Sequence, residues 1–349
     1  MMTCIFRSRS ALVASKLWPR AIGPRYSVSP SFLLLIFFYA SIALSQMQEA
    51  HILPPDHRGP ASVVDPMLKD RSKPLKVDVE LVLVPVTITD PLGRIVTGLA
   101  REHFAVYENK EQQEIRHLSS EDSPVSLGVI FDSSGSMAGK IERAREAVAE
   151  FFKTANPQDE FSMITFSDQP EVISDFTQSV EDIQSKLLYT LPKGRTALLD
   201  AIYLGVSKMR EAKYQRKALL IISDGGDNHS RYSEGEIKSL VKEADVLIYA
   251  IGIYDHYFPT EEERLGPALL NELTELSGGR AFTIDNPNDL ADVATKIGIE
   301  LRNQYMLAYR PKNPTHDGKW HKIRVKVIPP KGLPPLQVYA KTGYYAPAQ

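Results

Sequence analysis

The sequence predicts an α/β protein with a doubly wound, mostly parallel sheet, flanked by small β-sandwich segments. Apolar strands alternate with amphipathic helices over residues 124–304, which predicts a parallel sheet covered by helices on both faces. Strand-forming stretches without helical periodicity lie on both sides of this region. With 349 residues, of which 43% are hydrophobic and 24% charged, the chain has an ordinary globular composition. This length suits about two domains.

Residues 1–45 predict a secretory signal. They contain five basic side chains and no acidic ones, followed by an apolar run that starts at Phe32 and a small-x-small step that ends at Ser45. The apolar core of about 13 residues is shorter than the roughly 20 that a spanning helix needs, so we expect cleavage after Ser45. Because the basic region is long, an uncleaved anchor is the alternative. We therefore expect a periplasmic, envelope-associated or secreted protein.

Two features of the mature chain exclude classes of function. Cys4 is the only cysteine and lies ahead of the apolar run, so no disulfide and no cysteine-ligated metal is expected after cleavage. An exported chain without disulfides fits a bacterial envelope or secreted protein. Removal of residues 1–45 leaves 36 basic and 43 acidic side chains, so the mature chain has no excess of positive charge with which to bind nucleic acid.

Residues 46–74 are expected to form a linker, and residues 75–123 an N-terminal β segment. In its first strand, the apolar alternation of Leu81 and Leu83 changes phase at Pro85, which predicts a bulge or an edge position. Further short strands are expected at 95–99 and from Phe104 onward. About 50 residues is marginal for independent stability, so this segment needs a partner surface.

The central region, 124–304, is expected to alternate strands with helices. Strands are expected at 125–131, 161–166, 172–176, 218–222, 246–253 and 281–284, and helical apolar stripes at 141–152, 183–188, 198–209, 237–241, 269–276 and 290–301. The C-terminal β segment, 305–349, adds strand-like stretches at 305–309, 321–328 and 336–340. We expect 305–349 to pack with 75–123 as one β-sandwich into which the α/β domain is inserted. Two independent β modules are the alternative.

Oxygen-bearing side chains follow two of the expected strands. Asp132, Ser134 and Ser136 come directly after the first central strand, and Asp224 follows the strand at 218–222. If these strands are neighbours where the winding reverses, both carboxylates meet in one crevice, with Thr196 in a loop ahead of a helix. An all-oxygen set selects Mg²⁺, Mn²⁺ or Ca²⁺ over zinc or copper. For the first three residues alone, a plain strand-to-helix turn is the alternative.

This Asp-x-Ser-x-Ser loop, with a distant Thr and a distant Asp, resembles the metal-ion-dependent adhesion site of von Willebrand factor type A domains. The resemblance covers roughly residues 124–304. It implies that the hydroxyls of Ser134, Ser136 and Thr196 bind the cation directly, and that Asp132 and Asp224 supply charge directly or through water. The flanks resemble an exported bacterial subfamily first noted in acidobacteria, on the residues Asp90-x-x-Gly93, Gly98-Leu99 and Gly343-Tyr344-Tyr345.

The expected function is protein binding rather than catalysis. One coordination position of the cation is left open to an Asp or Glu of a partner protein. A structural envelope component with a fold-stabilising metal is one alternative. A metal-dependent hydrolase is a weaker one, since no histidine or glutamate is spaced with the motif as a general base. Other residues with two open interpretations are Asp200 and Asp227 (ligand orientation or capping), His229 (site or surface) and the aromatic loop 254–259 (recognition or packing).

Overall fold

The computed structural model describes residues 81–224, 226–254 and 261–348, which belong to one compact unit spanning Lys76–Gln349. The expected export signal and linker lie outside the described residues. Within the described ranges, no helix is both long enough and apolar enough to cross a membrane.

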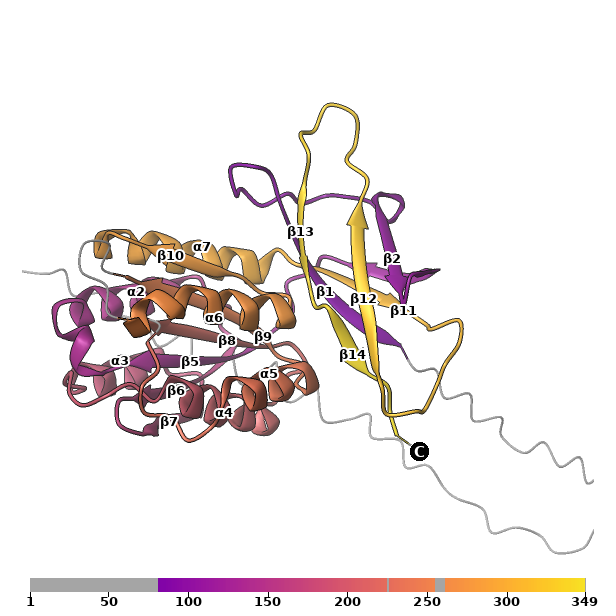
Figure 1. The fold of residues 1–349 in the computed structure, drawn as a ribbon. Helices are drawn as coiled ribbons and strands as arrows, with labels where there is room; N and C mark the ends of the chain where they lie inside the picture. The colour runs from indigo at the N-terminus through magenta and orange to yellow at the C-terminus, as the bar shows by residue number, and fades with distance from the viewer. Residues whose placement is uncertain (1–80, 225, 255–260, 349) are drawn as a thin grey trace, which may run out of the picture. The chain divides into compact units, whose positions relative to one another are not determined.

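A six-stranded, mostly parallel sheet forms the centre of the α/β domain (Figure 1). Its strands run in the order β10-β9-β8-β5-β6-β7, and only the β6–β7 pair is antiparallel. The fold class predicted from the strand–helix alternation is therefore confirmed. The strands are β5 (Ser126–Asp132), β6 (Glu160–Phe166), β7 (Pro170–Thr177), β8 (Lys217–Ser223), β9 (Leu247–Ile253) and β10 (Ala281–Ile284).

Helices cover both faces of this sheet. One face packs against α2 (Ile141–Lys153), α3 (Val180–Leu188) and α7 (Leu290–Arg302), and the other against α4 (Leu198–Lys208), α5 (Glu234–Glu243) and α6 (Glu261–Ser277). The sequence of β5 is almost continuously apolar because both faces of the strand are buried: Val129 and Phe131 enter one core and Ile130 the other. Short 3₁₀ turns complete the set, namely η2 (Arg101–His103), η3 (Gly135–Gly139), η4 (Met209–Glu211) and η5 (Pro287–Asp289).

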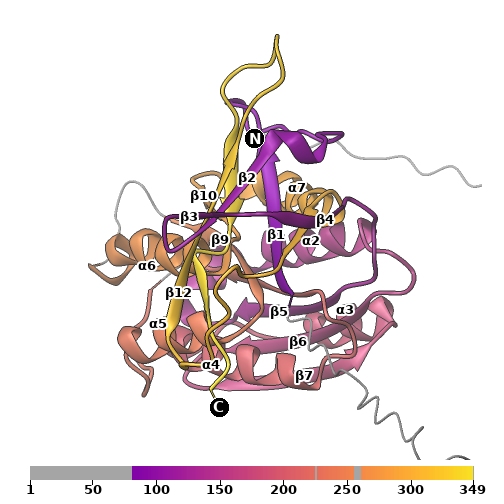
Figure 2. The same ribbon diagram turned by 90° about the vertical axis from the view of Figure 1, so that its right-hand side faces the viewer.

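The N- and C-terminal β segments share two antiparallel sheets, ordered β13-β1-β11-β4 and β14-β12-β2-β3. Each sheet contains strands from both ends of the described chain, so the indigo and yellow strands lie together in Figure 2. Their inward-facing side chains form a third core that includes Val84, Val106, Leu307 and Ile323. The strands are β1 (Val82–Thr89), β2 (Phe104–Glu108), β3 (Glu111–Gln113), β4 (Ile115–Ser119), β11 (Tyr305–Tyr309), β12 (Trp320–Val327), β13 (Gln337–Ala340) and β14 (Gly343–Tyr345).

Two local expectations for the N-terminal β segment hold only in part. The apolar phase does not change at Pro85, because the even-numbered residues of β1 face the core throughout and Leu81 and Leu83 point outward. Pairing of β1 with β11 is continuous through Pro85, so there is no bulge, but β13 pairs only with Val86–Thr89, and Pro85 therefore lies at an edge position, as the other half of the expectation has it. The strand expected at 95–99 is reduced to a single bridge between Thr89 and Ile95. The backbone N–H of Leu99 is instead used by the Tyr305 hydroxyl, 2.9 Å away.

Arg280 links the α/β domain to the sandwich. Its guanidinium lies 4.7 Å from the ring centre of Phe282 and 4.3 Å from that of Tyr339 on β13. It also pairs with the fully buried carboxylate of Glu300 on α7. Stacking on two rings together with a charge partner holds this cation in one orientation.

Candidate metal site

The two acidic residues of the predicted site lie at the ends of neighbouring strands. Asp132 is the last residue of β5, and Asp224 directly follows β8. These strands pair in parallel, with Phe131 opposite Ile222, and β5 is where the chain reverses its winding direction. Both side chains are buried, at 0% and 1% exposure. The structure therefore brings the two carboxyl groups to the edge of the sheet where ligands of such folds bind.

The loop after β5 is organised by the Asp132 carboxylate. One carboxylate oxygen accepts the backbone N–H of Ser134 at 2.8 Å, and the other accepts the Ser223 hydroxyl at 2.6 Å. The hydroxyl oxygens of Ser134 and Ser136 lie 3.0 Å apart. Ser134 is buried and Ser136 is exposed, so this pair of oxygens spans from the interior to the surface.

The loop that carries Thr196 is bound to the loop after β5 by its backbone. Lys193 N–H donates to Ser133 O at 2.9 Å, and Gly135 N–H donates to Gly194 O at 3.0 Å. Gly194 has φ +75°, and an added Cβ there would collide with the Asp168 carboxylate. Glycine at this position permits the close approach of the loop that carries Thr196 to Asp168 and to the loop after β5.

Sequence reasoning missed the part that Asn228 plays in fixing Thr196. The Asn228 side-chain oxygen accepts the Thr196 N–H at 3.0 Å, and the backbone N–H groups of Asn228 and His229 both donate to Thr196 O. Asp227 Oδ1 accepts the Leu198 N–H at 3.0 Å, at the start of α4. The polar run after Ser223 is a sequence signal for such capping, but it does not reveal which helix is capped.

The remaining candidates have structural contacts. Asp200 Oδ1 accepts the backbone N–H groups of Arg231 and Tyr232, which fastens the loop after β8 to α4. His229 Nε2 lies 3.1 Å from an Arg195 guanidinium nitrogen. Tyr254 is buried at 7% exposure, whereas residues 255–259 of the expected recognition loop lie outside the described residues.

The electrostatics of the site fit a bound cation. Burial, and then repulsion by Asp224, raise the pKa of Asp132 to about 7. Lys140 Nζ lies 3.6 Å from Asp224 Oδ2 and donates to Ile253 O at 3.2 Å, which brings one positive charge to this edge. A divalent cation among the oxygens would further offset the repulsion between the two carboxylates.

The donor set is poor in classical metal ligands. Within the described part of the chain, no group of three or more His, Cys, Asp or Glu side chains is arranged to hold a metal ion. The candidate site instead combines two carboxylates with three hydroxyls. Such an oxygen set suits a hard cation that retains some of its water, as Mg²⁺ does, better than zinc or copper.

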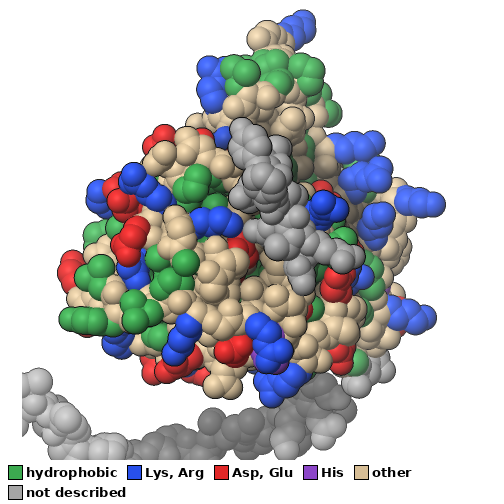
Figure 3. Space-filling view, turned by 60° about the vertical axis from the view of Figure 1, so that its left-hand side comes forward, with side chains coloured by type: hydrophobic (Ala, Val, Ile, Leu, Met, Phe, Trp, Pro, Cys, Tyr) green, Lys and Arg blue, Asp and Glu red, His purple; other side chains and the backbone are tan. Residues whose placement is uncertain are grey.

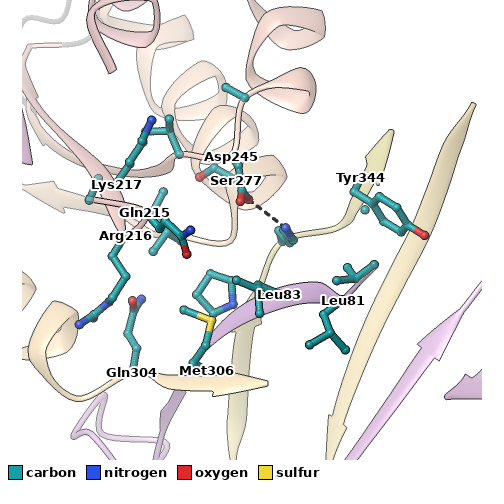
Figure 4. A pocket seen from close by; sticks show the side chains of 18 of the residues that line it. Leu81, Leu83, Gln215, Arg216, Lys217, Asp245, Ser277, Gln304, Met306 and Tyr344 are labelled. Carbon is teal, nitrogen blue, oxygen red and sulfur yellow. Dashed lines mark hydrogen bonds and ion pairs between the residues drawn. The ribbon is translucent and has the colours of Figure 1, made fainter. Parts of the chain in front are cut away.

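A cavity at the opposite end of the sheet is distinct from this site. It encloses about 740 Å³ between the sandwich and the amino ends of the central strands. Leu81, Leu83 and Met306 face it from the sandwich, and Arg216 and Lys217 from the α/β domain (Figure 4). None of the five predicted metal-site residues lines it.

Comparison with protein families identifies the region that holds this site. Residues 127–226 match the family model described as von Willebrand factor type A domain. Curated relatives include the inter-alpha-trypsin inhibitor heavy chain H4 of Homo sapiens, 23% identical over 206 residues, which are 55% of this chain and 22% of that protein. The Bos taurus heavy chain H4 is 25% identical over 35% of this chain and 15% of its own length. The chain thus spans only 15–22% of the length of these relatives.

Solved structures give matches of low identity. A von Willebrand factor type A protein from Catenulispora acidiphila aligns with a TM-score of 0.46 and 11% identity, over 76% of this chain and 75% of its own. BatB from Bacteroides thetaiotaomicron aligns with a TM-score of 0.41 and 17% identity, over 50% and 98%. The vWF domain of the type V pili tip protein Mfa5 from Porphyromonas gingivalis gives 0.40 and 16%, over 51% and 96%.

Proposed function

The chain contains a von Willebrand factor type A domain, and on this premise we propose that it is an exported protein-binding module that depends on a divalent cation. The cation would be Mg²⁺, or Mn²⁺ or Ca²⁺ in its place. An Asp or Glu side chain of a partner protein would complete the coordination of this cation. Domains of this type are generally interaction modules rather than enzymes, and we propose no catalytic activity for this one.

The observation that carries the proposal is the convergence of three loops at the winding reversal of the sheet. The loops that follow β5 and β8 and the loop that precedes α4 contribute the five oxygen-bearing residues. The proposed ligands are Asp132, Ser134, Ser136, Thr196 and Asp224. The hydroxyls would bind the cation directly, while the carboxylates would neutralise its charge directly or through water. Near-octahedral coordination by so few protein groups leaves a position for an external carboxylate.

Export is the second part of the proposal. It is supported by the basic, then apolar, N-terminus with its small-x-small step before Gln46. The module would then act in the periplasm, on the cell envelope or outside the cell. A site of modest affinity would suffice there wherever the free cation concentration exceeds Kd, because occupancy depends on the ratio of concentration to Kd.

The metal is tested by thermal unfolding of the full chain in chelator and with added Mg²⁺, Mn²⁺ or Ca²⁺. Wild-type protein is expected to unfold at a higher temperature with the cation, and the Asp132→Ala and Ser136→Ala variants are expected to lose most of this gain. Asp182→Ala removes an exposed carboxylate on α3 and serves as the matched control. An equal cation effect in all four proteins would exclude this site.

Partner binding is tested by capture of envelope and secreted proteins on immobilised wild type and Asp132→Ala, with and without chelator. The proposal expects specific capture by wild type with the cation and none in the other three conditions. Equal capture in all four would refute the metal bridge. A cation-dependent rise in stability without any cation-dependent capture would favour a structural role, which the buried Asp132–Asp224 pair also supports.

A further inference from the structure

An exposed apolar patch stands at the end of α3, in the segment Leu188-Tyr189-Thr190-Leu191. The side chains of Leu188, Tyr189 and Leu191 are 63%, 86% and 71% exposed. The neighbouring Leu187 is 2% exposed and belongs to the core, so the amphipathic pattern of α3 is satisfied without them. Single exposed apolar side chains are common on protein surfaces, but three within four residues require an explanation.

The patch segment is held in place by its own backbone. The N–H groups of Tyr189 and Thr190 donate to Lys186 O and Leu187 O at 3.2 and 3.1 Å. The carbonyl of Thr190 accepts a hydrogen bond from the guanidinium of Arg145, whose side chain is mostly buried beneath it. A segment fixed in this way presents its apolar side chains at low entropic cost to a partner.

The patch adjoins the candidate metal site. Lys193, two residues after Leu191, donates its N–H to Ser133 O, between Asp132 and Ser134. An extended chain advances at most about 3.6 Å per residue, so the Cα atom of Leu191 lies within about 7 Å of that of Lys193. Figure 3 looks obliquely onto this end of the α/β domain, and hydrophobic side chains gather toward its left edge.

Charged side chains around the site favour an acidic partner. Lys193 is exposed, Arg195 is 63% exposed and Arg231 is 81% exposed, and all three belong to the loops that surround the candidate site. Acidic side chains are interspersed with basic ones over this face (Figure 3), but Asp168 and Asp200 are already paired with Arg195 and Arg231. These four paired charges offset one another, so Lys193 and a bound divalent cation would supply the positive charge that an acidic partner meets.

We infer that the patch of Leu188, Tyr189 and Leu191 is the second half of the partner-binding surface, and that the partner is a protein segment with an acidic residue close to large apolar residues. This inference rests on the proposed function, because the acidic residue is the one that would complete the coordination of the metal. Leu191 lies two residues from Lys193, whose N–H bonds Ser133 O, so in an extended segment the apolar residues are expected within a few positions of the acidic one. The metal selects the carboxylate, and the patch selects its apolar neighbours.

The test is a selection of random peptides displayed on phage against the immobilised full chain in Mg²⁺, with elution by chelator. Enriched peptides are expected to share an acidic residue and large apolar residues at the stated spacing. One such peptide is then measured against wild type, against the triple variant Leu188→Ser, Tyr189→Ser, Leu191→Ser, and against the control Leu92→Ser, Ile328→Ser. The control residues are 76% and 60% exposed and lie outside the strands of the sandwich.

The triple variant is expected to bind the peptide about tenfold or more weakly, while the control retains wild-type affinity. Both variants change only exposed side chains, so their Mg²⁺-dependent gain in unfolding temperature should be unchanged, which shows that the metal site is intact. Chelator-eluted peptides that share an acidic residue but no apolar neighbours, and that bind the triple variant normally, would overturn the inference and leave the proposed function standing. Peptides without an acidic residue, equal binding to Asp132→Ala, or no enrichment would overturn both.

Discussion

Replacement of Asp132 by Asn is expected to stabilise the metal-free protein at neutral pH. The Asp132 carboxyl is fully buried, and burial together with Asp224 raises its pKa from 3.8 to about 7. In the unfolded chain it ionises near the usual value. The folded state therefore binds the proton more tightly, and the metal-free protein loses stability as the pH rises from about 4 to about 7. Above that range the loss is complete and constant.

The size of the effect follows from the pKa shift. About three pKa units at about 1.4 kcal/mol each give an upper limit of about 4 kcal/mol for the cost of the charge above pH 7. Asn retains an oxygen that can accept the N–H of Ser134, but its amide NH₂ replaces the oxygen that accepts the Ser223 hydroxyl. Rearrangement of that hydrogen bond costs about 1 kcal/mol. The net gain in the free energy of unfolding is expected to be about 1–3 kcal/mol.

The assay is urea unfolding of wild type and Asp132→Asn in chelator at pH 8 and at a series of lower pH values. Asp132→Asn is expected to be the more stable protein at pH 8, by a margin that shrinks as the pH approaches 4. Added Mg²⁺ should stabilise wild type and have little effect on the variant, whereas Asp182→Asn should behave as wild type in both respects. A variant that is less stable than wild type at pH 8 in chelator, or a margin that does not change with pH, would refute the electrostatic reasoning.

Three further predictions concern single side chains. Ser136→Ala should weaken Mg²⁺ binding, measured by titration calorimetry, with little change in metal-free stability, because the Ser136 side chain is exposed. Gly194→Ala should destabilise the protein by about 1–2 kcal/mol in urea unfolding, because residue 194 has a positive φ. It should also weaken Mg²⁺ binding, because the new Cβ collides with Asp168. Unchanged Mg²⁺ affinity would show that the two loops move independently. Arg280→Met should lower the free energy of unfolding by about 3 kcal/mol, since it removes the guanidinium that pairs with the buried Glu300 carboxylate. Burial raises the pKa of Glu300, so this loss of stability should lessen as the pH falls toward that pKa. A loss that does not change with pH would contradict this account.

The two carboxylates of the candidate site could be placed from the sequence because their convergence depends on the order of the strands. Strands β5 and β8 are recognisable as buried apolar runs, and parallel neighbours end at the same edge of a sheet, so residues 132 and 224 had to converge if the strands were adjacent. Thr196 was placed by its position ahead of α4. These inferences need only the order of elements, which periodicity reveals well.

What the sequence did not reveal depends on specific packing. The side chain of Asn228 holds Thr196 from a loop more than 30 residues away, and a polar loop residue carries no mark of the partner that it caps. In β1, Leu81 and Val82 are equally apolar, so alternation could not decide which face enters the core. The residues from Ile95 onward have strand-forming side chains, yet only Ile95 and Val96 reach the backbone of β1, and the Tyr305 hydroxyl bonds Val96 O and the Leu99 N–H instead of a neighbouring strand.

The sharing of sheets between the two ends of the described chain has a consequence for the order of folding. β1 is synthesised more than 200 residues before β11, the strand that pairs with it. Until then its backbone groups and its row of valines have no strand to pair with, which is the condition under which edges join the wrong chain. Because α7 ends at Arg302 and β11 begins at Tyr305, completion of the α/β domain delivers the missing strand. A chain truncated after α7 should therefore keep the metal site yet aggregate through β1.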